Sequence, residues 1–266
     1  GVEDTQAWPA FLAQWLTPQR VLNLGLIDAG PQQYLHVYET FQRALHPRVV
    51  LVGLSLATDF DDAELFDRWW RTADRENYRV WKTSEPLRLA HPLDTFYTLV
   101  SRYSYLFRIV GSSRARVTPF RCLDGVWLSL FPDQFEATSV KAHPDQHAFH
   151  LVLRALQRLH VLAQEQGASI LVVFQPSKEE TYLPLLSHTL PDLQHPLQEA
   201  LAQHGIAMLD LTPVFRHRAA LGARLFFPVN ASPNTQGHLL IARSVFRHLT
   251  GQAPTDHLRL WEQGAW

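Results

Sequence analysis

The sequence predicts a three-layer α/β/α protein built on a parallel sheet, and three observations lead to this prediction. Short, continuously apolar runs of strand length recur along the chain, as expected for strands that are covered on both faces. Segments with the 3.6-residue periodicity of helices lie between these runs. Strands that alternate with helices imply right-handed crossovers and a parallel sheet with helices on both sides.

The first half of the chain begins this alternation. Residues 7–16 predict a short apolar helix, and the apolar run Arg20–Leu26 predicts a buried strand. Pro31 opens a second predicted helix, which ends at His46 because a proline follows it. The apolar face of this helix consists of Tyr34, Tyr38, Phe41 and Leu45.

Residues 48–56 form the clearest predicted strand, because this run is continuously apolar and rich in β-branched residues. Beyond it the periodicity weakens and aromatic residues accumulate. We interpret residues 60–142 as an insertion packed on the main sheet, since no Gly/Ser/Pro-rich linker flanks it. Within the insertion we expect a helix over residues 91–110 and a strand or hairpin arm over residues 123–130.

Regular alternation resumes in the second half. The predicted elements are, in order, a helix over residues 145–166, a strand over 169–174, a helix over 191–204 and a strand over 206–211. Gly167 and Gly205 supply the stop signals of the two helices. Ser177 and Glu180 have the spacing of a capping box, and Asn234 can cap a final helix.

Composition excludes several classes of protein. The 266 residues (1–266) suit one large domain, and 24 Lys+Arg against 25 Asp+Glu lack the basic surplus of a nucleic-acid binder. Cys122 is the single cysteine, so an intramolecular disulfide and a multi-cysteine zinc site are excluded. No apolar window of about 18 residues predicts a transmembrane segment. The chain begins with Gly1 and polar residues unlike a signal peptide, which we interpret as a processed or partial product.

Ligands of parallel α/β sheets bind beyond the carboxyl ends of the strands. Four segments with polar or turn-forming residues lie at these predicted ends: residues 23–32, 57–62, 175–184 and 230–238. We expect the cleft to be bordered by Gly25, Asp59, Lys178 and Asn234.

The order and spacing of these segments resemble those of the SGNH/GDSL hydrolases, flavodoxin-like α/β/α enzymes that include esterases, lipases and carbohydrate O-acyl hydrolases or transferases. Residues 1–16 look like the segment after the nucleophile block of this family. Asn23–Gln32, Val49–Asp62 and Asn230–His238 look like its second, third and last blocks. Pro176–Tyr182 is similar to a run in members related to polysaccharide acetylation proteins. The resemblance covers nearly the whole chain.

The resemblance implies a Ser nucleophile, a His base oriented by Asp, and oxyanion donors from the Ser backbone, a Gly and an Asn. The nucleophile block would precede Gly1 and is not in this chain. Asp28 occupies the position of the oxyanion glycine, where its carboxylate would repel a developing oxyanion. Thr58 occupies the position of the oxyanion asparagine, and losing one such donor costs roughly 2.7–4 kcal/mol of transition-state stabilisation.

The last block departs from the family pattern in the same way. Asn230 and Ser232 stand at the positions of the catalytic Asp and His, while Asn234, Gly237 and His238 retain its scaffolding residues. An unactivated serine hydroxyl hardly accepts a proton near neutral pH, and Asn230 carries no charge to stabilise an imidazolium. We therefore expect a domain whose ancestral triad has decayed.

The resemblance also predicts an incomplete sheet. The first strand of the family lies between the positions taken here by residues 20–26 and 48–56. Without that strand, both neighbours would expose unpaired backbone groups. We expect either a gap at this place or a further N-terminal segment in the natural protein.

Several chemistry-bearing residues have alternative interpretations. His238 is either a displaced base or a packing residue in the first turn of a helix. Lys178, Glu179 and Glu180 either take part in chemistry or serve the capping box alone. Four other patterns could each bind a ligand, but ordinary surface or core roles explain them better. Zinc could bind at His143, His147 and His150, and another cation at Asp59, Asp61 and Asp62. A sugar could stack on Trp69, Trp70 and Trp81, and a phosphate could bind at Asn23, Gly25 and Gly30.

The sequence thus predicts an SGNH/GDSL hydrolase-like domain, linked by ancestry to O-acyl esters of carbohydrates or lipids and catalytically impaired as it stands. We expect a small-molecule or glycan acyl ester as its partner, with no nucleic acid, metal or other cofactor. Two alternatives remain open: a scaffold that binds a glycan or a protein without turnover, and an active esterase that uses His238 and an upstream serine. The resemblance makes a periplasmic or other extracytoplasmic location plausible.

Overall fold

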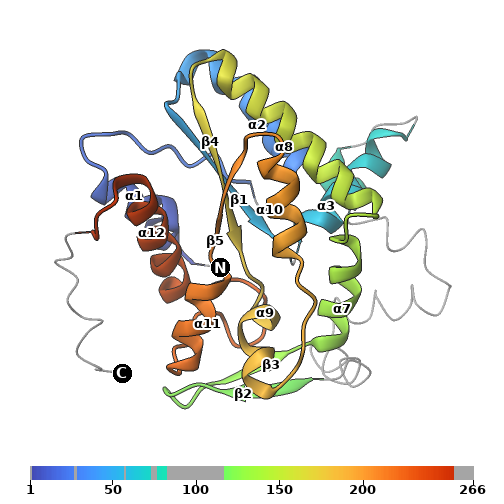
Figure 1. Ribbon diagram of the computed structural model, residues 1–266, viewed down its shortest axis with the longest axis vertical. Helices are drawn as coiled ribbons and strands as arrows, with labels where there is room; N and C mark the ends of the chain where they lie inside the picture. The colour runs from blue at the N-terminus through green and yellow to red at the C-terminus, as the bar shows by residue number, and fades with distance from the viewer. Residues whose placement is uncertain (1, 27–28, 57, 73–76, 83–116, 255–266) are drawn as a thin grey trace.

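The computed structural model describes residues 2–26, 29–56, 58–72, 77–82 and 117–254. Figure 1 shows the arrangement of its helices and strands. In chain order the labelled elements are η1 (Asp4–Gln6), α1 (Trp8–Trp15), α2 (Pro31–Leu45), β1 (Val49–Ser55), α3 (Asp59–Trp70), β2 (Thr118–Arg121), β3 (Trp127–Leu130), α7 (Pro132–Lys141), α8 (His147–Glu165), β4 (Ser169–Gln175), α9 (Lys178–Tyr182), η3 (Leu183–Leu186), α10 (Gln194–Ala202), β5 (Ala207–Asp210), α11 (Thr212–Ala220) and α12 (Thr235–Thr250).

A parallel sheet with the strand order β1-β4-β5 forms the centre of the molecule. Strand β1 pairs with β4 from Val49 opposite Ser169 to Ser55 opposite Gln175, and β4 pairs with the shorter β5. The central strand β4 is buried over most of its length, which explains its uninterrupted apolar sequence. The parallel α/β class predicted from the sequence is confirmed.

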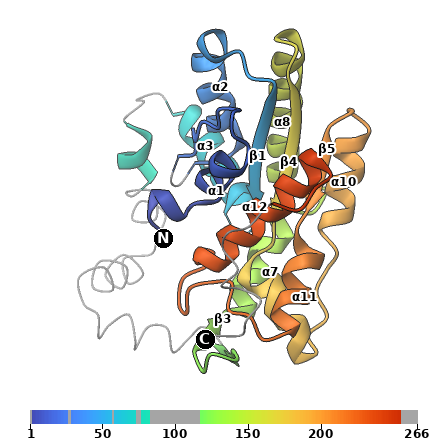
Figure 2. The same cartoon turned by 90° about the vertical axis from the view of Figure 1, so that its left-hand side faces the viewer.

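Helices flank this sheet, as Figures 1 and 2 show. Alternate residues of β4 belong to two hydrophobic clusters, because successive side chains of a strand point to opposite faces. Ile170, Val172 and Phe174 pack in one cluster with residues of α2, α3, α8 and α10. Leu171 and Val173 pack in the other with residues of α1, α11 and α12.

Most predicted elements are confirmed within two or three residues. The helices predicted over residues 7–16, 145–166 and 191–204, and the one opening at Pro31, correspond to α1, α8, α10 and α2. The predicted strands over residues 48–56, 169–174 and 206–211 correspond to β1, β4 and β5. Gly167 and Gly205 have φ angles of +71° and +69°, the left-handed conformation that glycine adopts at a helix end. The strand β3 is one arm of a hairpin with β2, as predicted for residues 123–130.

The strand predicted over Arg20–Leu26 is wrong. These residues have no regular secondary structure, and Leu22, Leu24 and Leu26 remain 47%, 41% and 48% exposed. An apolar run becomes a strand only where a neighbouring strand offers backbone partners, and sequence periodicity does not report that neighbour. The helix predicted over residues 91–110 lies outside the described residues.

The packing of two helices also differs from the prediction. In α2 the predicted apolar face is only partly covered, since Tyr38 is buried while Phe41 and Leu45 are exposed. Beyond Asp59, where the sequence pattern weakens, the chain forms the regular helix α3, which buries Phe60 and contacts α8. The aspartates in the first turn of α3 interrupt the apolar pattern, so the sequence did not predict this helix.

The outer edge of β1 lacks a partner strand in the described part of the chain. The Ser55 N–H on this edge donates to the carboxylate of Asp59. Backbone groups alternate in direction along a strand, so those of Val49, Leu51 and Gly53 point to the same edge. No backbone partner for them occurs among the described residues. Within the described part of the chain, these backbone groups therefore form an unpaired edge of the sheet.

We predict that Val49→Lys reduces self-association through this edge, because a charged side chain blocks strand pairing. Val161→Lys on α8 is the matched control, since Val161 is 43% exposed and Val49 is 41% exposed. Light scattering during mild heating should show at least about a twofold smaller aggregated fraction for Val49→Lys than for the control. Equal behaviour of the two variants would show that added charge, and not the edge, is responsible.

Candidate functional site

A cavity of about 290 Å³ lies at the carboxyl ends of β1 and β4. Leu56 follows β1, and Ser177 opens α9 after β4, so the two central strands deliver residues to the same place. The helix α7 and the loop 229–231 complete the walls. The cavity is lined by Leu56, Phe131, Gln134, Phe135, Thr138, Ser177, Lys178, Glu179, Val229, Asn230 and Ala231.

Lys178 is completely buried and joins α9 to the loop that contains Asn230. Its Nζ donates to the carbonyl oxygens of Pro228, Val229 and Asn230 at 3.4, 3.2 and 3.1 Å. The ammonium also lies 5.7 Å from the centre of the Phe131 ring. Burial lowers the pKa of Lys178. Because an ammonium has three donors, these carbonyls occupy its hydrogen-bonding capacity.

The two glutamates after Lys178 have different roles. Glu179 lines the cavity, where its Oε1 accepts a hydrogen bond from the Phe131 N–H at 3.1 Å, and burial raises its pKa. Glu180 faces away from the cavity and completes the predicted capping box, since its N–H donates to Ser177 Oγ and its Oε2 accepts from the Ser177 N–H. Its other oxygen accepts from the Gln194 side chain. Burial raises the pKa of Glu180 to about 7.

Asn230 and Ser232, which the sequence resemblance aligned with a catalytic acid and base, are exposed in a turn. The Oδ1 of Asn230 accepts from the Ser232 N–H at 3.0 Å, and the Ser232 carbonyl accepts from the Phe227 N–H at 3.1 Å. These contacts shape the turn. Asn230 borders the cavity, whereas Ser232 does not.

His238 lies in the first turn of α12 and faces α1. Its Nδ1 accepts a hydrogen bond from the Trp8 N–H at 3.4 Å, and burial lowers its pKa to about 4. An imidazole in this setting serves to join α1 to α12. The packing interpretation of His238 is therefore favoured over that of a displaced base.

The segment that follows β1 contributes one exposed and one buried side chain. Thr58 is exposed at the start of α3, and its carbonyl accepts from the Asp62 N–H at 2.8 Å. Asp59 is buried and accepts from the Tyr34 hydroxyl at 2.7 Å as well as from the Ser55 N–H. Burial raises the pKa of Asp59 to about 7, although both hydrogen bonds favour the charged form. Asp59 thus fastens the end of β1 to α2.

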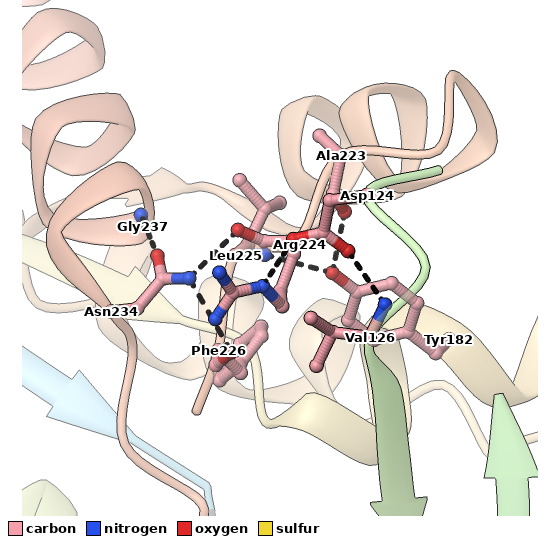
Figure 3. Close-up of polar contacts among 9 residues, drawn as sticks. All are labelled: Asp124, Val126, Tyr182, Ala223, Arg224, Leu225, Phe226, Asn234 and Gly237. Atoms are coloured by element: carbon pink, nitrogen blue, oxygen red, sulfur yellow. Dashed lines mark hydrogen bonds and ion pairs between the residues drawn. The ribbon is translucent and has the colours of Figure 1, made fainter. Parts of the chain in front are cut away.

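Asn234 fixes the start of α12, as Figure 3 shows. Its Oδ1 accepts from the Gly237 N–H at 3.0 Å, as predicted for an N-cap. Its Nδ2 donates to the carbonyls of Arg224 and Phe226 at 2.8 and 3.4 Å. A Cβ at position 237 would lie 2.3 Å from the Leu225 carbonyl oxygen, which explains the glycine. Asn234 and Gly237 are thus structural residues, as the scaffolding interpretation of this block expected.

Residues 223–226, which include the carbonyls bound by Asn234, are also held by α9. The Tyr182 hydroxyl donates to the Ala223 carbonyl at 2.7 Å and accepts from the Leu225 N–H at 2.9 Å (Figure 3). Arg224 pairs with Asp124 of the β2–β3 turn at 2.6 Å. Residues 223–226 are therefore anchored to three separate parts of the fold.

The remaining candidate residues are dispersed. Asp28 lies outside the described residues. Gly25 is exposed, and its N–H donates to the Asn23 side chain at 3.1 Å. Asp61 and Asp62 pair with Lys141 and Lys82, each at 2.6 Å.

The histidine and tryptophan patterns have structural partners. His143 contacts Asp145, while His147 contacts Asp67 of α3. Among the described residues, no three potential metal-ligating side chains form a group. Trp69 and Trp70 pack with Phe66, and Trp81 is buried against Tyr78.

Sequence reasoning missed the wall formed by α7. Phe131 and Phe135 are four residues apart and Pro132 occupies the first helical position, which together could have indicated this helix. A larger hollow of about 560 Å³ lies between α2 and α8, but it contains none of the predicted site residues. The cavity next to α9 is therefore the candidate site.

Comparison with known proteins does not assign this site. No family model matches the chain, and no curated protein or solved structure matches it either. None of the helices in the described ranges has the length and hydrophobicity needed to cross a membrane. The function has to be inferred from the residues around the cavity.

We predict that Lys178→Met lowers the free energy of unfolding by about 2 kcal/mol, because three carbonyl oxygens lose a charged donor. Lys141→Met is the control: Lys141 is 37% exposed and pairs with Asp61 and Glu64, so its loss should cost at most about 1 kcal/mol. Urea denaturation measures both values. A Lys178→Met protein as stable as the control variant would contradict the role given to this ammonium.

We also predict a specific pH dependence for Asp59→Asn. The pKa of Asp59 is raised from 3.8 to about 7, so between these values the folded state holds a proton that the unfolded state releases. This side chain therefore makes the folded state less stable as pH rises through that window. The Tm of Asp59→Asn relative to the unmutated protein should increase between pH 4.5 and 7.5. A Tm difference between Asp59→Asn and the unmutated protein that stays constant over this pH range would refute the prediction.

Proposed function

We propose that this chain is an SGNH/GDSL hydrolase-like domain of the three-layer α/β/α type, which binds an O-acyl ester without efficient turnover. The parallel order β1-β4-β5 and the separate hydrophobic clusters on the two faces of β4 support this architecture. The location of the cavity supports a ligand site, since ligands of such sheets bind at the carboxyl ends of the strands.

The surroundings of His238 carry the proposal of impaired catalysis. A general base works best with a pKa near the operating pH, whereas the pKa of His238 is about 4 and its Nδ1 is engaged by the Trp8 N–H. None of the described residues that line the cavity is a histidine. Ser232, at the position of the family base, holds a turn through its backbone. These observations favour binding over the alternative of an active esterase that uses His238.

Hydrolysis of p-nitrophenyl acetate tests this proposal. We expect the unmutated chain, Ser232→Ala and His238→Ala to release p-nitrophenol at rates within about twofold of one another, because an acyl-transfer site without its triad retains little of its catalysis. His217→Ala on α11 controls for the loss of an exposed histidine. Turnover that persists in the His217→Ala control and is lost in His238→Ala would instead establish the active esterase.

A further inference from the structure

The size of the cavity limits its ligand. About 290 Å³ lies at the small end of the range for ligand pockets. A ring the size of one monosaccharide, with at most a short acyl group, fits such a volume. A long acyl chain does not. Within the proposed function, the cavity therefore distinguishes between the two kinds of ester that the ancestry suggests.

The lining suits a ring with one apolar and one polar side. Phe131, Phe135 and Leu56 supply apolar surface, and aromatic rings pack well on the C–H face of a sugar. Gln134 and Thr138 lie one turn apart on α7 and make no side-chain hydrogen bond within the described part of the chain. A few polar groups set among apolar side chains are typical of a small-molecule site.

The hydrogen-bonding groups of the lining favour a neutral ligand over an anion. Among the described residues that line the cavity, Lys178 carries the positive charge, but its three N–H donors are occupied by carbonyl oxygens. Among the same residues, Glu179 carries the carboxylate, and its Oε1 accepts a hydrogen bond from the Phe131 N–H. A ligand carboxylate would thus find no free cationic donor and would lie against the carboxylate of Glu179, whose charge is balanced by the nearby ammonium, whereas a ligand hydroxyl could donate to Glu179.

We propose that the cavity is a subsite for one neutral, hydroxyl-bearing ring, and that Glu179 is its specificity-determining residue. This inference rests on the proposed function and narrows it to carbohydrate esters with short acyl groups. It also predicts that uronic acids and long-chain esters are excluded.

Titrations followed by amide NMR at pH 8 test the inference. The probes are methyl 6-O-acetyl-β-glucopyranoside, methyl β-glucuronide and methyl 6-O-octanoyl-β-glucopyranoside. We expect the acetyl ester to shift amide signals of α7 and α9, and the other two probes to bind at least about tenfold more weakly. Equal affinity for the glucuronide or the octanoyl ester, or no shift with any probe, would overturn the inference.

Two variants connect the selectivity to residues. Glu179→Gln keeps an acceptor for the Phe131 N–H but removes the charge, so the acetyl ester should bind at least about fivefold more weakly and the glucuronide should lose its disadvantage. Glu165→Gln, on the far hollow, is the matched control. Thr138→Val provides a second test if Glu179→Gln does not fold, and it should also weaken the acetyl ester. Unchanged affinities in a folded variant would refute the role of its residue.

The same samples separate this inference from the proposed function. Acetate released from the ester appears in the one-dimensional spectrum, so turnover would refute impaired catalysis while the order of affinities still reports on Glu179. Absent turnover together with equal affinity for all three probes would refute the inference alone.

Discussion

The buried ammonium of Lys178 is the interaction on which the site depends. A charge without solvent must be compensated, and here three consecutive carbonyl oxygens surround it. This compensation joins the segment after the central strand to a loop about fifty residues further along the chain. The joined elements enclose the cavity between α7 and α9. The charge is thus used to build the wall of the site and not to attract a ligand.

The sequence predicted the elements whose signals are local. Strands β1, β4 and β5 are mainly apolar, and Ser177 and Glu180 form the expected capping box. Arg20–Leu26 has a similar apolar signal but does not form a strand, because a strand also needs a neighbour with free backbone groups. Likewise α3 begins with three aspartates, two of which are buried: Tyr34 and Ser55 donate to the carboxylate of Asp59, and Lys82 pairs with Asp62. Such long-range partners leave no periodic pattern.

In the candidate site, too, local signals could be predicted from the sequence and long-range contacts could not. The position of Lys178 at the end of β4 predicted a place beside the cleft, and Lys178 lines the cavity in the structure. Its carbonyl partners could not be predicted from neighbouring residues. The α7 wall was also missed, since Phe131 and Phe135 stand in a stretch rich in aromatic residues. Conversely, His238 lies at the predicted start of the last helix, but its Nδ1 faces the Trp8 N–H of α1. A motif fixes where a residue lies along a helix, and the packing of adjacent helices decides what its side chain contacts.

The loop over residues 227–232 is fixed at both ends and in the middle. Phe226 and Pro233 form an isolated bridge, Asn234 binds the carbonyl of Phe226, and Lys178 holds the carbonyls between them. The loop has therefore lost much of its conformational freedom before any ligand arrives. A ligand that contacts it would not have to compensate for that ordering, so even a small, weakly interacting molecule can be held by a preorganised surface.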